Sequence, residues 1–284
     1  MIKYTLMLLG SALVRFLPVE FAYLSARVIG RIAYWLFRGK RRIADENLRI
    51  IFSGELGTAG RRRLVKSLFT HMALNTADFL RFPYSTYLKG RLKTQGIDLF
   101  IDSYRKGRGV VLVSPHVGNW EVGGMLLAGF GFPVNVVTES IRPQKTRFKE
   151  DRIANLYRRR REAVGMKTIP LERSGIREFR ALKRGEILAL VADRHISGSG
   201  EDVEFFGMKS RVPKGPAALA LRTRAPIFVG VCVRSSQNQL CGIFEPVRYD
   251  GENIHELTEL LVRKMEYYIR RYPDQWFVFQ PPWS

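Results

Sequence analysis

The sequence predicts an α/β fold in which a mainly parallel sheet is flanked by helices. Short apolar runs rich in β-branched residues, such as Val110–Val113, are bounded by glycine or proline and indicate buried strands. Between them lie longer stretches in which apolar residues recur every three or four positions, as in amphipathic helices. Strands that alternate with helices are typical of a parallel sheet covered on both faces. With 284 residues, 46% of them hydrophobic, the chain can form a large core.

The expected elements follow in order along the chain. The first helices are expected at 43–52, at 61–80 and at Asp98–Arg105, before the central strand Val110–Val113. After that strand, further strands are expected at Val134–Thr138, Lys167–Leu171, Ile187–Ala192, Ile227–Val233 and Gly242–Val247, and helices at 146–164, 174–183, 216–224 and 254–271. We expect one domain over residues 43–284, preceded by a distinct segment over residues 1–42.

Residues 1–42 are hydrophobic and amphipathic, and we expect them to form a membrane-associated helix. Tyr4–Val14 is uncharged but shorter than the about 20 residues that a membrane-spanning helix needs. Polar and apolar side chains then form separate stripes: Glu20, Arg27, Arg31 and Arg38 on one, and Phe21, Leu24, Val28, Ile32 and Trp35 on the other. The basic cluster Arg38–Arg42 suits anionic headgroups. The alternative is a helix that docks on the core and exposes a basic end, and both interpretations can hold for different parts.

The stretch GVVLVSPHVGNWEVGG at 109–124 places polar side chains directly after the central strand. His116 lies in the loop, and Glu121 lies in the first turn of the next expected helix. Open α/β sheets bind ligands at the carboxyl ends of their strands. Histidine is a suitable base near neutral pH, and a carboxylate can hold its ring in the tautomer that frees the other nitrogen. A loop histidine followed by an acid that favours a helix N-terminus is the structural alternative.

The net charge of +21, from 47 basic and 26 acidic side chains, indicates a polyanionic partner such as nucleic acid, anionic lipid or an acidic protein. Nucleic acid is disfavoured, because no helix-turn-helix, zinc or RNA-recognition signature accompanies the charge. Cys232 and Cys241 lie within expected strands, which indicates buried thiols rather than a disulfide or a metal site.

HVGNWE resembles the His-x4-Asp/Glu motif of the glycerolipid and lysophospholipid acyltransferase superfamily. The wider sequence is similar to the branch that contains the late acyltransferases of lipid A and the phosphatidylinositol mannoside acyltransferases. The supporting segments are RRIADENLRIIF at 41–52, VADRHISGSG at 191–200, VEFFG at 203–207, VPKGPAALALRTRAPIFVG at 212–230 and YPDQWFVFQPPW at 272–283.

This resemblance implies that an acyl chain moves directly from a thioester, acyl-ACP (acyl carrier protein) or acyl-CoA, to a hydroxyl of a membrane glycolipid. His116 would be the general base and Glu121 would orient its ring. Backbone N–H groups near Gly118 and Asn119, or a nearby arginine, are the candidates for binding the oxyanion, and Asn119 is expected at the substrate. No metal, cofactor or acyl-enzyme is implied.

The expected acceptor is a lipid A precursor, in lipopolysaccharide biosynthesis at the cytoplasmic face of the inner membrane. Phosphatidylinositol mannosides and other lysolipids are alternative acceptors. Two non-enzyme classes are also considered, namely a basic nucleic-acid-binding protein and a membrane adaptor that kept the fold without the activity.

Four more residues are candidate substrate contacts. In the run Arg158–Arg161, the resemblance favours Arg161, four residues before Gly165, as a phosphate contact, whereas a solvated helix face is the default. Asp193 and Arg194 follow an expected strand and either meet the ligand or form an internal ion pair. Glu204 is a candidate second carboxylate. His195 is not expected to be catalytic.

Overall fold

The computed structural model describes residues 16–82, 90–138, 152–171, 175–194 and 200–283, and its centre is a seven-stranded sheet of order β1-β9-β8-β2-β5-β3-β4. The strands are β1 (Leu92–Gln95), β2 (Val110–Ser114), β3 (Val134–Thr138), β4 (Lys167–Pro170), β5 (Ile187–Val191), β8 (Ile227–Arg234) and β9 (Leu240–Val247). Neighbouring strands are parallel except β8 and β9, which are antiparallel. The predicted mainly parallel sheet is confirmed.

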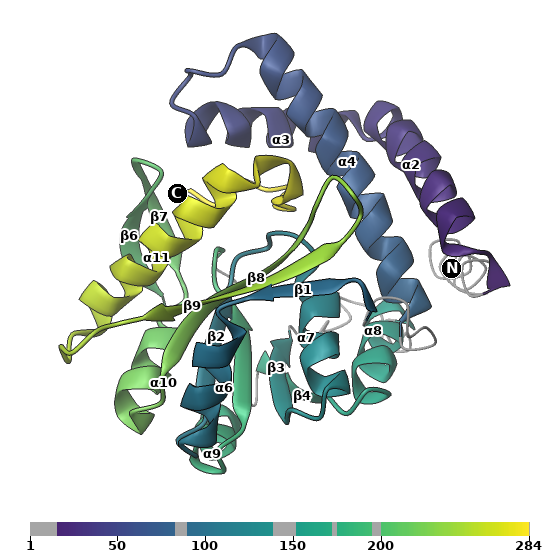
Figure 1. Ribbon diagram of the computed structural model, residues 1–284. Coiled ribbons are helices and arrows are strands. Elements are labelled where there is room, and N and C mark those ends of the chain that lie inside the picture. The colour runs from purple at the N-terminus through teal and green to yellow at the C-terminus, as the bar shows by residue number, and fades with distance from the viewer. Residues whose placement is uncertain (1–15, 83–89, 139–151, 172–174, 195–199, 284) are drawn as a thin grey trace, which may run out of the picture.

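Helices cover both faces of this sheet (Figure 1). On one face lie α6 (Ile97–Arg105) and α7 (Trp120–Gly129), and on the other lie α9 (Ile176–Lys183), α10 (Gly215–Thr223) and α11 (Ile254–Arg271). Side chains alternate along β2, so that Leu112 packs in the core beneath α7 whereas Val111 and Val113 pack in the core beneath α10 and α11. The central strand is therefore buried on both faces, which explains its continuous apolar run.

The sequence reasoning missed β1 and the hairpin of β6 (Glu201–Phe205) and β7 (Met208–Val212). These strands are short, and charged or polar residues occupy many of their positions, so they lack the apolar runs that marked the other strands. Helix α8 is described from Arg152 to Glu162. The calls on Tyr4–Val14, on 146–151 and on His195 lie outside the described residues.

Three helices from the N-terminal part lie over the carboxyl end of the central strands (Figure 1). Helix α2 (Val19–Leu36) packs along α4 (Thr58–Arg81), and α3 (Arg38–Ile51) runs through the expected segment boundary at residue 42. Gly30 brings α2 close to its neighbour, since a Cβ there would lie 2.7 Å from the Cα of Thr70. Within the described residues, no helix is long and apolar enough to cross a bilayer.

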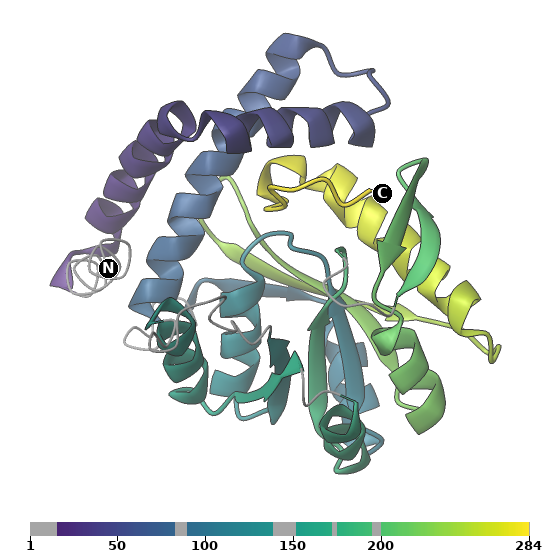
Figure 2. The same cartoon turned by 180° about the vertical axis from the view of Figure 1, so that it is seen from behind.

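Helix α2 has two apolar faces with different surroundings. Its inner face is made of buried and mostly small side chains: Val19, Ala22, Tyr23, Ala26, Gly30 and Tyr34. Its outer face carries large exposed side chains, namely Phe21, Leu24, Val28, Ile29, Ile32, Trp35 and Leu36. Both views show α2 at the edge of the molecule beside α4 (Figures 1 and 2). The core-docking and surface interpretations of this segment therefore apply to opposite sides of one helix.

Candidate active site

The loop after β2 brings His116 to the residue that follows β5. The two strands are paired in parallel with Ser114 opposite Val191, so the chains leaving them meet. His116 Nδ1 lies 2.6 Å from Asp193 Oδ1, and the backbone N–H of His116 donates to Asp193 Oδ2 at 2.7 Å. Trp276 donates its Nε1–H to the same Oδ2 at 2.7 Å. These contacts fix the imidazole ring against a carboxylate that is 0% exposed.

The environment keeps Asp193 ionised. Burial by itself disfavours the carboxylate, but the charge of His116 and the hydrogen bonds from His116 and Trp276 outweigh it and hold the pKa of Asp193 below its usual value. An ionised carboxylate only accepts hydrogen bonds, so in the neutral form of His116 the proton sits on Nδ1 and Nε2 keeps its lone pair. The His116 side chain is 14% exposed, so the ring is mostly but not fully buried.

The prediction that Glu121 orients His116 is wrong, because Asp193 occupies that place. Glu121 points to α8 instead: Arg161 Nε donates to Glu121 Oε2 at 2.9 Å, and a terminal nitrogen of Arg161 donates to Oε1. The two side chains are 13% and 19% exposed. The loop-to-helix turn was predicted, but the partner that the parallel pairing of β2 and β5 brings to His116 was not.

The loop amides are already bonded inside the protein, which corrects the predicted oxyanion site. Gly118 N–H donates to Gln275 O at 2.8 Å, and Asn119 N–H donates to Cys232 O at 2.6 Å. Gly118 has φ +68°, and a Cβ there would lie 2.1 Å from the Cys232 oxygen, so only glycine fits this approach. Of the two candidates for oxyanion binding, the arginine is the one left.

Asn119 caps α7 in place of the expected substrate contact. The side chain is buried, its Oδ1 accepts from Val122 N–H at 3.4 Å, and its Nδ2 donates to Asp78 at 3.2 Å. Both polar atoms of this amide therefore face protein groups.

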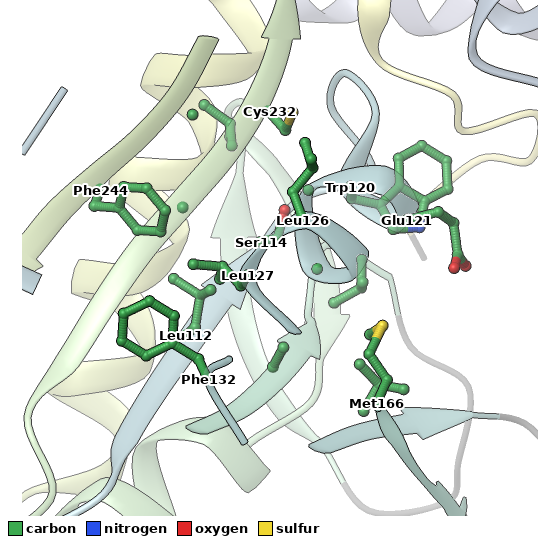
Figure 3. Close-up of a pocket in the computed structure, with 18 of the residues that line it drawn as sticks. Leu112, Ser114, Trp120, Glu121, Leu126, Leu127, Phe132, Met166, Cys232 and Phe244 are labelled. Atoms are coloured by element: carbon green, nitrogen blue, oxygen red, sulfur yellow. The ribbon is translucent and has the colours of Figure 1, made fainter. Parts of the chain in front are cut away.

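An apolar cavity of about 470 Å³ lies between α7 and the sheet (Figure 3). Glu121, Arg161 and Trp120 line it near the His116 loop, and the Trp120 ring stands edge-on to the His116 ring with centroids 5.0 Å apart. Figure 3 shows Phe132 and Phe244 at the opposite end from Glu121. Small residues widen the slot on both walls, namely Gly123 and Gly124 from α7 and Gly230 and Gly242 from the sheet. The shape and lining suit an extended hydrocarbon chain with a polar head at the Glu121 end.

The arginines of the run Arg158–Arg161 lie in different surroundings. Arg158 is exposed and pairs with Glu162 in its own helix. Arg160 is buried and donates to the carbonyls of Leu80 and Phe82, at 2.7 and 2.8 Å, where α4 ends. Only Arg161 lines the cavity. The predicted contact of Arg161 with a substrate phosphate stays a prediction, and the sequence reasoning missed the structural role of Arg160.

The remaining predicted residues lie as follows. Arg194 is half-buried beside Asp193, and its contact with substrate stays a prediction. Glu204 is exposed on the β6–β7 hairpin and is absent from the cavity lining, so the structure gives no support to a second carboxylate there. Trp276, which the sequence reasoning did not single out, completes the site from the C-terminal segment. Its only sequence signal was the YPDQWFVFQPPW block.

Comparisons with known proteins identify the family of the chain. Residues 1–284 match the family model described as bacterial lipid A biosynthesis acyltransferase. The chain belongs to this family. A phosphatidylinositol mannoside acyltransferase of Mycolicibacterium smegmatis is 30% identical over 205 residues, or 68% of this chain and 64% of the relative.

Two further relatives, phosphatidylinositol mannoside acyltransferases from two strains of Mycobacterium tuberculosis, are each 27% identical over 195 residues, or 66% of this chain and 58% of the relative. The acyltransferase chain studied here thus spans less than two thirds of the length of these relatives.

Proposed function

We propose that this protein transfers a fatty acyl chain from an acyl thioester to a hydroxyl of a membrane glycolipid, with His116 as general base. The observation that carries the proposal is the His116–Asp193 pair, together with the contact of the His116 ring with Trp120, which lines the apolar cavity. Membership of the lipid A acyltransferase family favours a lipid A precursor as acceptor. The names of the mycobacterial relatives make a phosphatidylinositol mannoside the alternative.

In this mechanism, Nε2 of His116 removes the proton of the acceptor hydroxyl while that oxygen attacks the thioester carbonyl. A C–O bond forms, and the carbonyl oxygen becomes an oxyanion. The tetrahedral intermediate then expels the thiolate, which takes the proton from the imidazolium and leaves as a thiol. Asp193 stabilises the imidazolium, and base catalysis of this kind contributes about 10²–10⁴-fold. Arg161, held by Glu121 at the cavity, supplies positive charge for the oxyanion or for a substrate phosphate.

The cavity would hold the acyl chain of the donor. Burial stabilises a hydrocarbon chain by about 0.8 kcal/mol per methylene, so an apolar slot of this kind would favour binding of a long chain. The head of the thioester would then lie near Trp120, next to His116. Both acyl-ACP and acyl-CoA fit this arrangement, because an acidic carrier and a phosphorylated cofactor are each attracted by a chain with net charge +21.

The outer face of α2 would lie on the membrane. Its exposed apolar side chains adjoin basic residues at Arg31 and at Arg38–Arg42, which suits an interface with anionic lipid. A helix in this position would dock the enzyme at the cytoplasmic face of the inner membrane, where the acceptor is embedded and acyl thioesters are available.

The deciding experiment compares His116→Ala with His255→Ala. His255 lies on α11 and is 48% exposed, so its loss controls for removal of an imidazole away from the site. Purified variants receive a long-chain acyl thioester with either a lipid A precursor or a phosphatidylinositol mannoside, and the product is identified by mass spectrometry. We expect His116→Ala to lose at least 10²-fold in turnover and a few degrees in melting temperature, because the buried Asp193 carboxylate loses a hydrogen bond. His255→Ala should match wild type. Turnover of His116→Ala above a tenth of wild type would exclude the general-base role.

Membrane binding is tested with point substitutions, because deletion of α2 would also remove its inner face from α4. Leu24→Ser and Trp35→Ser should each reduce flotation with anionic vesicles. Leu99→Ser, at a leucine of α6 that is 55% exposed, should not. Equal flotation of all three variants would place the membrane contact elsewhere.

A further inference from the structure

A buried ion pair joins three elements next to the active-site loop. Asp78 of α4 pairs with Arg234 at the end of β8, and the two side chains are each 1% exposed. Tyr23 of α2 donates its hydroxyl hydrogen to Asp78 Oδ1 at 2.7 Å. None of these three residues lines the cavity, and none contacts His116 in the interactions described above. These three side chains therefore do not contact a ligand in the cavity directly.

The ion pair is connected to the loop that carries His116. Asp78 Oδ2 accepts from Asn119 Nδ2 at 3.2 Å, which holds the residue that caps α7. Gln275 exchanges two hydrogen bonds of 2.9 Å with the backbone of Arg234, and its own carbonyl accepts from Gly118 N–H at 2.8 Å. Arg234 thus holds Gly118 by way of Gln275, and Asp78 holds Asn119 directly. Gly118 and Asn119 lie two and three residues after His116.

Asn75 adds another connection, one turn before Asp78 on α4. Its Nδ2 donates to Gly118 O at 2.9 Å, and its Oδ1 accepts from Arg234 at 3.4 Å. Helix α4 therefore contacts the loop at two groups, the Gly118 carbonyl through Asn75 and the Asn119 side-chain amide through Asp78.

Such a network of charged side chains costs free energy of desolvation in a protein interior. Charged groups lose hydration on burial, and replacing a buried pair with apolar residues is often neutral or stabilising. Burial also raises the pKa of the Asp78 carboxyl, although Arg234, Tyr23 and Asn119 oppose that shift. A stability role alone does not explain why this network ends on the loop. Directional hydrogen bonds, unlike apolar packing, fix the position of each backbone group that they reach.

We propose that Tyr23, Asp78 and Arg234 are positioning residues for the acyl-transfer reaction, which set the loop so that His116 meets the head of the acyl chain. The inference rests on the proposed function and goes beyond it, because it makes α2 part of the active site as well as a surface element. The helix whose outer face meets the membrane reaches the catalytic loop through its inner face, by way of Tyr23, Asp78 and Asn119. A substitution at one of these three residues should lower kcat and leave donor binding unchanged, because none of them lines the donor cavity.

The test uses Tyr23→Phe, with Tyr34→Phe as the matched control. Both tyrosines are buried on the inner face of α2, but the Tyr34 ring packs against Phe69 at the far end of the helix, away from the network. Tyr23→Phe removes a single hydroxyl and leaves the ion pair neutral overall, so the variant folds. Kinetics with a long-chain acyl thioester and a glycolipid acceptor, vesicle flotation, melting temperature and amide hydrogen exchange of residues 116–119 are measured for both variants.

We expect Tyr23→Phe to lower kcat by about ten-fold or more, as small misplacements of reacting groups do, with KM for the thioester and flotation within two-fold of wild type. Exchange of the Gly118 and Asn119 amides should become faster, and Tyr34→Phe should match wild type in every measurement. Asn119→Asp supplies a second variant. It keeps the oxygen that caps α7, but it places a second carboxylate against Asp78, and it should lower kcat further.

Wild-type kcat and unchanged exchange in Tyr23→Phe would overturn the inference. So would a loss of kcat that disappears when the assay is run at a lower temperature matched to the change in melting temperature, since that identifies a stability role. Failure of the proposed function looks different: wild type would not transfer an acyl chain, or His116→Ala would. In that case the exchange measurement still decides whether Tyr23 holds the loop.

Discussion

Replacing Asp193 with asparagine changes the tautomer of His116 while it keeps the size of the side chain. Asp193 Oδ2 accepts two N–H groups, from the His116 backbone and from Trp276, each at 2.7 Å. In the variant, the amide oxygen must take this place, because an NH₂ group there would face two donors. The NH₂ group then takes the place of Oδ1, 2.6 Å from His116 Nδ1. Nδ1 becomes an acceptor, and the proton of the ring moves to Nε2.

The size of the effect follows from this exchange of roles. A histidine protonated at Nε2 cannot take a proton from the acceptor hydroxyl, and it lacks the carboxylate that stabilises the imidazolium. In catalytic Ser-His-Asp triads the same substitution lowers kcat by about 10⁴-fold through the wrong tautomer. We expect Asp193→Asn to lose about 10³–10⁴-fold in kcat. The lost charge-assisted bond costs about 1–2 kcal/mol of stability, or a few degrees in melting temperature.

The assay follows thiol release and acylated product with saturating thioester for wild type, Asp193→Asn and Glu121→Gln. Glu121→Gln weakens the contact with Arg161 and leaves the His116 ring in place, so its loss of kcat should be clearly smaller. If Asp193→Asn kept more than a tenth of wild-type kcat while Glu121→Gln was inactive, Glu121 would be the orienting carboxylate and the tautomer argument would be refuted.

Three further predictions concern charge, pH and chain length. Arg161→Lys should lower kcat/KM about ten-fold because lysine cannot form the two-point contact with Glu121, whereas Arg158→Lys, at an exposed position, should stay within two-fold of wild type in the same assay. Hydrogen bonds, first from Arg184 and then from Lys167, outweigh burial and lower the pKa of Glu186 from 4.5 to about 2, so its stabilisation is complete above pH 4.5 and disappears as the pH falls to about 2. In urea titrations Glu186→Gln should therefore be about 1–2 kcal/mol less stable than wild type at pH 7, after allowance for solvent screening, and should equal it near pH 2. Gly242→Val places its Cβ 3.4 Å from the Phe244 ring inside the cavity; at about 0.8 kcal/mol per excluded methylene, kcat/KM for the longest thioesters should fall on the order of ten-fold while shorter ones are unaffected.

Local patterns were enough to predict most of the framework. The strand Val134–Thr138 and the helix Ile254–Arg271 agree with the structure at both ends, because each has a single buried stripe or run with clear boundaries. The polar strand Leu92–Gln95 was missed because its pairing with β9 depends on residues about 150 positions away in the chain. Hydrophobic periodicity carries no information about such a partner.

The site was predicted only in part, because local sequence patterns do not reveal partners that are distant in the chain. His116 followed from its place after a buried strand, and that placement is local. Its partner Asp193 lies 77 positions away, and it becomes a neighbour only because β5 pairs with β2, an order of strands that the sequence does not state. The nearer carboxylate, Glu121, was therefore chosen instead. The burial of Arg160 beside the exposed Arg158 likewise depends on where α4 ends, which no count of charges reveals.

The contributions of the C-terminal segment have a consequence for the order in which the molecule matures during synthesis. Trp276 completes the shell around Asp193, Gln275 receives the Gly118 amide, and Asn47 donates to the carbonyl of Val278 at 2.9 Å. A chain emerging from the ribosome has already made His116, Asp193 and the whole sheet before any of these contacts exists. The His116 loop and the Asp193 carboxylate therefore acquire their full set of partners only when the last stretch of the chain folds back over the loop.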